Sequence, residues 1–169
     1  LQKIVHSLKI DGRCAVILPL GRELASRAAA EIKLRRVFLC AVDLVEIIVI
    51  PAAAFNTKSI RPVLALVFNK RAEMGEFVER KYRGTTWTIT VKDDSLPVTE
   101  EVKLLQMRTG ADGIVTADTE PIPNMPVSIS IDKIEDAGWS LLPDDYRPRE
   151  DPLIAFGLAP GQNLAYPMV

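Results

Sequence analysis

The chain has 169 residues, of which 48% are hydrophobic and 25% are charged, and its formal net charge is −1. This composition predicts a globular core, and no apolar run reaches the roughly 18 residues that a membrane-spanning helix needs. The small net charge hides an asymmetry, because residues 1–92 have a balance of +8 and residues 93–169 a balance of −9. Either the basic half faces a polyanion, or the two halves attract each other.

The first half of the chain alternates between helical and strand patterns. Residues 1–9 and 22–40 have the spacing and composition of helices. Three apolar segments predict strands, at residues 13–18, 44–50 and 61–69. Only residues 52–60 connect the last two strands, too few for a parallel crossover, so we expect that pair to be antiparallel. The prediction is an α/β fold whose sheet is mostly parallel and ends in an antiparallel strand.

The second half gives weaker patterns. Residues 85–91 alternate and predict a strand, and residues 98–108 suit a short helix. A strand and a helical turn are expected within residues 127–137. The remaining expectations are a proline-rich loop at residues 112–126 and a flexible tail at residues 148–169. We therefore expect three parts: residues 1–92, a small acidic α+β extension at 93–147, and the tail at 148–169.

Three segments resemble adenine-specific DNA methyltransferases. The first, Leu-Lys-Ile-Asp-Gly-Arg-Cys-Ala-Val-Ile-Leu-Pro at residues 8–19, resembles the fifth strand of their catalytic sheet. The second comprises Pro-Ala-Ala-Ala-Phe-Asn-Thr-Lys-Ser-Ile at 51–60 and Leu-Ala-Leu-Val-Phe-Asn-Lys at 64–70, similar to the loop and last strand of that sheet. The third, Ile-Glu-Asp-Ala-Gly-Trp-Ser-Leu-Leu-Pro-Asp-Asp-Tyr at 134–146, is similar to a phrase near the end of type I modification subunits.

This resemblance implies the fold and the chemistry. The chain looks like the C-terminal part of a type I restriction-modification methylase, forming the second half of a Rossmann-like sheet. The implied cofactor is S-adenosylmethionine and the implied substrate is adenine in DNA. The family's glycine-rich cofactor loop and Asn-Pro-Pro-Tyr motif are absent from this sequence, so we expect no catalytic residue in this chain. A small irregular C-terminal region would complete the fold.

The candidate site residues lie mainly in one loop. A base that is methylated in a duplex must leave the stack, and in the resembled family an aromatic side chain then supports it. Phe55 matches that position, with packing in the core as the alternative; Lys58 and Arg61 flank the loop and could contact DNA phosphates or simply be solvated. Trp139 and Tyr146 could anchor a tail or a partner subunit, or pack locally.

Metal, location and partners complete the expectations. His6 is the only histidine, and no cluster has metal-ligand spacing, so we predict no metal site. The two cysteines sit among apolar residues, which favours free thiols in a reducing cytoplasm. The implied partners are DNA and a specificity subunit, without a membrane. The alternative function is a non-catalytic module that binds a specificity or other partner subunit through its acidic half.

Overall fold

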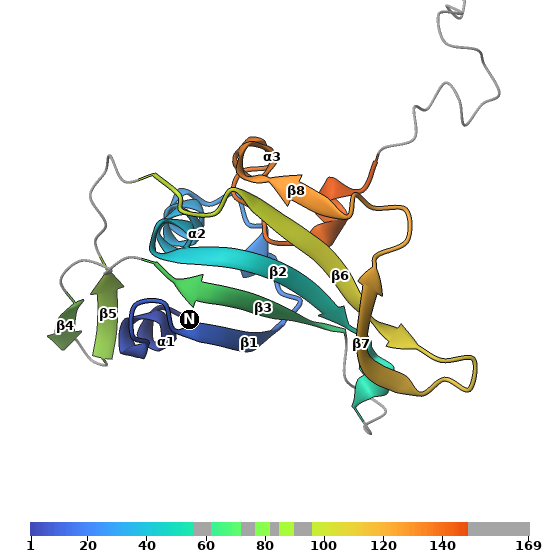
Figure 1. The fold of residues 1–169 in the computed structure, drawn as a ribbon. Helices are drawn as coiled ribbons and strands as arrows, with labels where there is room; N and C mark the ends of the chain where they lie inside the picture. The colour runs from blue at the N-terminus through green and yellow to red at the C-terminus, as the bar shows by residue number, and fades with distance from the viewer. Residues whose placement is uncertain (56–61, 72–76, 82–84, 90–95, 149–169) are drawn as a thin grey trace, which may run out of the picture.

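The structure is a computed structural model that describes residues 1–55, 62–71, 77–81, 85–89 and 96–148. Its sheets and helices follow one another along the chain as shown in Figure 1. The elements are α1 (Gln2–Ser7), β1 (Arg13–Pro19), η1 (Arg22–Leu24), α2 (Ala29–Ala41), β2 (Val42–Ile50), η2 (Ala52–Ala54), β3 (Val63–Lys70), β4 (Phe77–Lys81), β5 (Thr85–Ile89), β6 (Glu101–Thr109), β7 (Val115–Pro121), β8 (Ser128–Ser130), α3 (Ile131–Asp136) and η3 (Pro143–Tyr146).

The main sheet has six strands in the order β1-β3-β2-β6-β7, with β8 also pairing with β6. Strand β3 is antiparallel to both β1 and β2, which confirms the expected antiparallel pairing of the last two predicted strands. The fold is therefore a mixed α/β fold. The expectation of a mostly parallel sheet is wrong for the described strands, because β2–β6 is their only parallel pair. The reason is that β3 lies between β1 and β2 and separates these two parallel strands.

The region after residue 96 extends this same sheet. The helix expected at residues 98–108 is wrong, since β6 occupies most of that segment, with Val102 and Leu104 buried and Glu101 and Lys103 exposed. This alternation is the period of a strand, and pairing on both edges outweighs the helix propensity of the segment. Strand β7 also lies within the expected loop at 112–126. The expected strand and helical turn within 127–137 are confirmed as β8 and α3.

The predicted boundary at residue 93 separates strands that share one sheet, because β6, β7 and β8 join β1–β3. The strand expected at 85–91 is present as β5, which pairs with β4 in a separate two-stranded sheet. The tail expected at 148–169 lies almost wholly outside the described residues. No helix among the described residues is long and apolar enough to cross a membrane.

The described helices bury their apolar residues on one face of the sheet. Val5 of α1, Phe38 of α2 and Ile134 of α3 belong to one core cluster with Leu66 of β3 and Leu104 of β6. Phe38 meets Phe68 edge to face, with ring centroids 5.2 Å apart, a preferred geometry for aromatic pairs. This core fixes the position of α2 over β3.

The opposite face of the sheet carries a row of apolar side chains. Side chains alternate between the faces of a strand, and the register aligns Ile17 with Ala65, Ala65 with Ile48, and Ile48 with Leu105 across four strands. We call these four residues the apolar row. Ile17, at the end of the row on β1, is 58% exposed. The described helices bury their side chains in the core of the other face, so the row is left without a helical layer.

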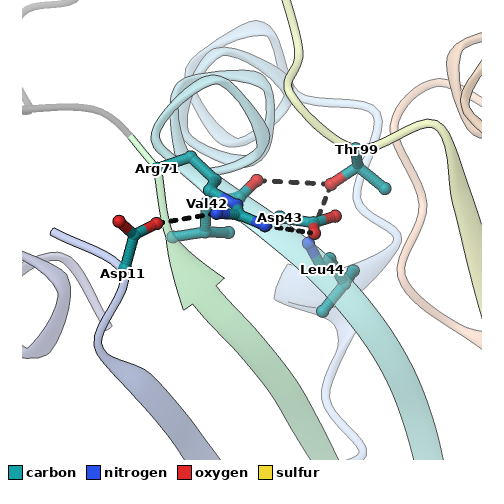
Figure 2. A network of polar contacts seen from close by, with 6 residues as sticks. All are labelled: Asp11, Val42, Asp43, Leu44, Arg71 and Thr99. Carbon is teal, nitrogen blue, oxygen red and sulfur yellow. Dashed lines mark hydrogen bonds and ion pairs between the residues drawn. The ribbon is translucent and has the colours of Figure 1, made fainter.

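A buried hydroxyl satisfies the backbone of β2 just before the point where β2 begins to pair with β6. Strand β2 pairs with β6 only from Glu46 onward, so the backbone of β2 before that residue needs another partner on the β6 side. Thr99 supplies it, as Figure 2 shows: its hydroxyl oxygen accepts from the Leu44 N–H at 2.8 Å and donates to the Val42 carbonyl at 3.2 Å. The side chain of Thr99 thereby joins the segment before β6 to β2. Arg71 lies in the same view, 2.6 Å from a carboxylate oxygen of Asp11.

We predict that Thr99→Val destabilises the chain by about 1–3 kcal/mol, because the Leu44 N–H and the Val42 carbonyl stay buried without their partner. The measurement is the midpoint of urea unfolding at unchanged slope. Thr119→Val is the matched control, since Thr119 is exposed on β7, and we expect it to stay within about 0.5 kcal/mol of the native chain. Equal effects of the two substitutions would show that the Thr99 hydroxyl contributes nothing.

Candidate functional site

The loops after β1 and β2 leave the sheet at the same edge. Pro19 at the end of β1 and Ile50 at the end of β2 both pair with Val63, the first residue of β3. Each strand ends at or next to a proline, Pro19 and Pro51, which stops the ladder there because proline has no N–H to donate. We call this side the carboxyl edge of the sheet. In α/β sheets, ligands commonly bind where parallel strands end.

Phe55 lies at the carboxyl edge. The 3-10 turn η2 follows β2 directly, with Pro51 at its N-cap, and the Phe55 N–H closes the turn by donating to the Ala52 carbonyl at 3.1 Å. The side chain of Phe55 is half-buried and is not part of the core cluster between the sheet and the helices. The turn η2 lies beside β7. The structure therefore places an aromatic residue at the rim of the sheet. Lys58 and Arg61 lie outside the described residues.

Trp139 and Tyr146 are packed within the chain. Trp139 is 7% exposed and belongs to the core cluster. Tyr146 is half-buried, and its hydroxyl donates to the Ser140 carbonyl. Burial raises the pKa of the Tyr146 phenol above its ordinary value, with Asp145 raising it further and Arg35 opposing the shift. Both side chains thus have contacts inside the chain, and partner binding by them stays a prediction.

Arg35 is a residue that our sequence reasoning did not single out. It is 6% exposed on α2, and its guanidinium donates to the carbonyls of Glu23, Ser26, Gly138 and Trp139. Desolvation by burial lowers its pKa, and the nearby Glu31, Tyr146 and Asp145 oppose that shift. In the sequence Arg35 stands beside Arg36, just before the apolar end of the helix, and nothing there distinguishes it or reveals its partners.

An apolar cavity of about 420 Å³ lies between α1, the end of β1 and α2. Its lining includes Leu18, Pro19, Leu34 and Phe38, and Glu31 contributes a buried carboxylate oxygen without a hydrogen-bond partner among the described residues. No glycine lines the cavity, so it lacks the close backbone approach by which glycine-rich loops hold nucleotide-like cofactors. The lining of this cavity by itself therefore does not fit S-adenosylmethionine. Nor do the described residues hold a group of three residues suited to a metal ion.

Comparison with known proteins gives one family match. The family model described as N-6 DNA Methylase matches residues 1–151. No curated protein matches the chain.

Several solved structures are similar to this chain at low sequence identity. The M protein of the type I restriction enzyme EcoKI is 17% identical, with a TM-score of 0.42 over 88% of this chain and 26% of that one. A modification subunit of a putative type I restriction enzyme from Vibrio vulnificus YJ016 is 14% identical, with a TM-score of 0.43 over 89% of this chain and 30% of that one. A type I R-M system structure is 10% identical, with a TM-score of 0.46 over 88% of this chain and 32% of that one. The chain thus spans about a quarter to a third of these proteins.

We predict that Tyr146→Phe destabilises the chain by about 0.5–1.5 kcal/mol near neutral pH, because it removes the bond to Ser140. The raised pKa of the phenol means that the folded chain holds this proton more tightly than the unfolded chain. The contribution of the Tyr146 phenol to the free energy of unfolding is therefore complete below pH about 10, the pKa of a tyrosine in the unfolded chain. That contribution is lost as the pH rises further. Urea unfolding of both chains at several alkaline pH values measures the effect. The difference between them should shrink above pH about 10, and a constant difference would contradict the shift.

Proposed function

Because the chain belongs to the N-6 DNA methylase family, we propose that it is the C-terminal part of an enzyme that methylates adenine in DNA. In this proposal the methyl group passes from S-adenosylmethionine to the exocyclic amine of the base. One structural observation supports the assignment most directly: the loops after β1 and β2 share the carboxyl edge, where Phe55 is half-buried at the rim. An aromatic ring in that place can support a base that has left the duplex.

The proposal assigns a supporting role to Phe55. A base taken out of its stack loses the contacts of both flat faces, and stacking on an aromatic side chain restores about 1–3 kcal/mol per base. Phe55 follows directly on η2, so the turn and strand β2 hold the backbone from which the ring projects. Lys58 and Arg61 would contact the phosphates on either side of the base, where cations supply most of the affinity.

The cofactor pocket and the catalytic polar groups would come from another part of the enzyme. Two features of the sheet favour such a complement. Strand β1 pairs only with β3 among the described strands, so its other edge offers unpaired backbone donors and acceptors. None of the described helices covers the apolar row on the opposite face, and its aliphatic side chains could be buried against further elements. A second set of strands and helices would pair with the free edge of β1 and cover the apolar row.

We also propose that the enzyme works within a restriction-modification system, with a specificity subunit as its partner. The resemblance of residues 134–146 to the end of type I modification subunits motivates this assignment, and Trp139 and Tyr146 lie in that segment. Recognition of the DNA sequence would then reside in the partner, and the described chain would supply the support for the target base.

We predict that Phe55→Ala in the complete enzyme lowers the methylation rate on duplex DNA by about 5- to 150-fold, the equivalent of losing about 1–3 kcal/mol of stacking. Cofactor affinity should stay nearly unchanged. Phe55→Trp is the matched aromatic control and should keep most of the rate, whereas Phe55→Leu should behave like Phe55→Ala. The measurement is single-turnover methylation of an oligonucleotide duplex. A leucine variant as fast as the native enzyme would assign Phe55 to packing.

We further predict that the isolated chain does not bind S-adenosylmethionine in isothermal titration calorimetry, because its described residues offer no glycine-lined cradle for the cofactor. The same titration on the complete enzyme is the control and should give measurable heat. Micromolar binding by the isolated chain would contradict the division of roles proposed above.

A further inference from the structure

The loop after β1 is held by groups from distant parts of the chain. Three of its carbonyls accept hydrogen bonds: Glu23 from the Arg35 guanidinium at 2.6 Å, Ser26 also from Arg35, and Leu24 from the Leu141 N–H at 2.8 Å. Leu24 is also 6% exposed and belongs to the core cluster. This loop starts from the carboxyl edge, so its conformation bears on the candidate site.

The C-terminal segment presents two carbonyls to the same guanidinium. Helix α3 ends with the Trp139 N–H donating to the Ile134 carbonyl at 2.7 Å and the Gly138 N–H to the Glu135 carbonyl at 2.8 Å, which are the two bonds of a Schellman cap. Gly138 and Trp139 then take left-handed conformations, with φ of 69° and 61°. Their carbonyls accept from Arg35 at 3.1 and 2.7 Å.

Arg35 therefore stands between two segments that are more than a hundred residues apart. Its guanidinium fork uses Nε, Nη1 and Nη2 at once. A lysine ammonium has no such planar fork and cannot reach both sets of carbonyls from one position. Glu31 and Asp145 balance the charge of the guanidinium at longer range. The four hydrogen bonds of Arg35 given above are all donated to main-chain carbonyls.

We propose that Arg35 is a positioning residue that couples the loop after β1 to the C-terminal segment Gly138–Leu141, so that a change in one segment reaches the other. The coupling itself does not depend on the proposed function. Only its consequence does, namely that the C-terminal segment influences the candidate site at the carboxyl edge. A coupling between two segments is reciprocal. Loosening the C-terminal segment should therefore loosen the loop, even though the altered residue lies outside the loop.

The test is hydrogen exchange of the full chain with a substitution on the C-terminal side. Gly138→Ala penalises the left-handed backbone, and an added Cβ there would meet no atom within 4 Å. We expect exchange of the peptide covering residues 20–28 to rise about tenfold, with strands β1 and β3 unchanged. Gly113→Ala is the matched control, because Gly113 also has a positive φ, of 78°, and open space around it, but lies in the β6–β7 turn. It should leave residues 20–28 unchanged.

Substitution of Arg35 itself provides the second arm. Arg35→Met should raise hydrogen exchange in both segments together, and Arg35→Lys should not restore protection. Arg27→Met is the control at an exposed arginine of the same loop, and it should change exchange in neither segment. Faster exchange confined to residues 137–141 in Gly138→Ala would overturn the coupling. A rise spread equally over β1 and β3 would also overturn it, because Arg35 would then be an ordinary core residue. If Arg35→Met fails to fold, the Gly138→Ala result still decides. A failure of methylation would leave these exchange measurements untouched.

Discussion

The insertion of β3 between β1 and β2 is the constraint on which the rest of the structure depends. Both edges of β3 are occupied, so its backbone groups are satisfied within the sheet. Leu64, Leu66 and Phe68 are then fully buried on the face that α2 covers. The same insertion makes β1 and β2 parallel and brings their ends opposite Val63. The position of the Phe55 loop follows from this pairing.

The three strands β1–β3 could be predicted from the sequence because each is a short apolar run bounded by a turn or a proline. The antiparallel pairing of β2 and β3 followed from the length of their connection. Strands β6 and β7 could not be predicted in the same way. Their segments combine helix-favouring residues and prolines, and only the partners on either side, far along the chain, decide that they are strands. The separate extension expected at 93–147 was based on charge, which does not report strand pairing.

The candidate site was accessible to sequence reasoning only in part. The resemblance singled out Phe55, and the structure places it at the rim of the sheet. Arg35 was inaccessible because its partners are main-chain carbonyls, which every residue carries and which leave no trace in the sequence. For Trp139 the sequence left a partner anchor and local packing open; in this structure its side chain lies in the core beside α3 while its carbonyl accepts from Arg35, and partner binding stays a prediction.

The apolar row has a practical consequence for handling this chain alone. Ile17, at the end of the row, is 58% exposed, whereas Ala65 is 7% exposed. An exposed aliphatic side chain favours contact between molecules, and a formal net charge of −1 provides almost no long-range repulsion to keep the molecules apart. We therefore expect purified preparations to associate through this end of the row as their concentration rises. Salts such as sulfate, which strengthen burial of apolar surface, will increase that association, and mild detergent will reverse it.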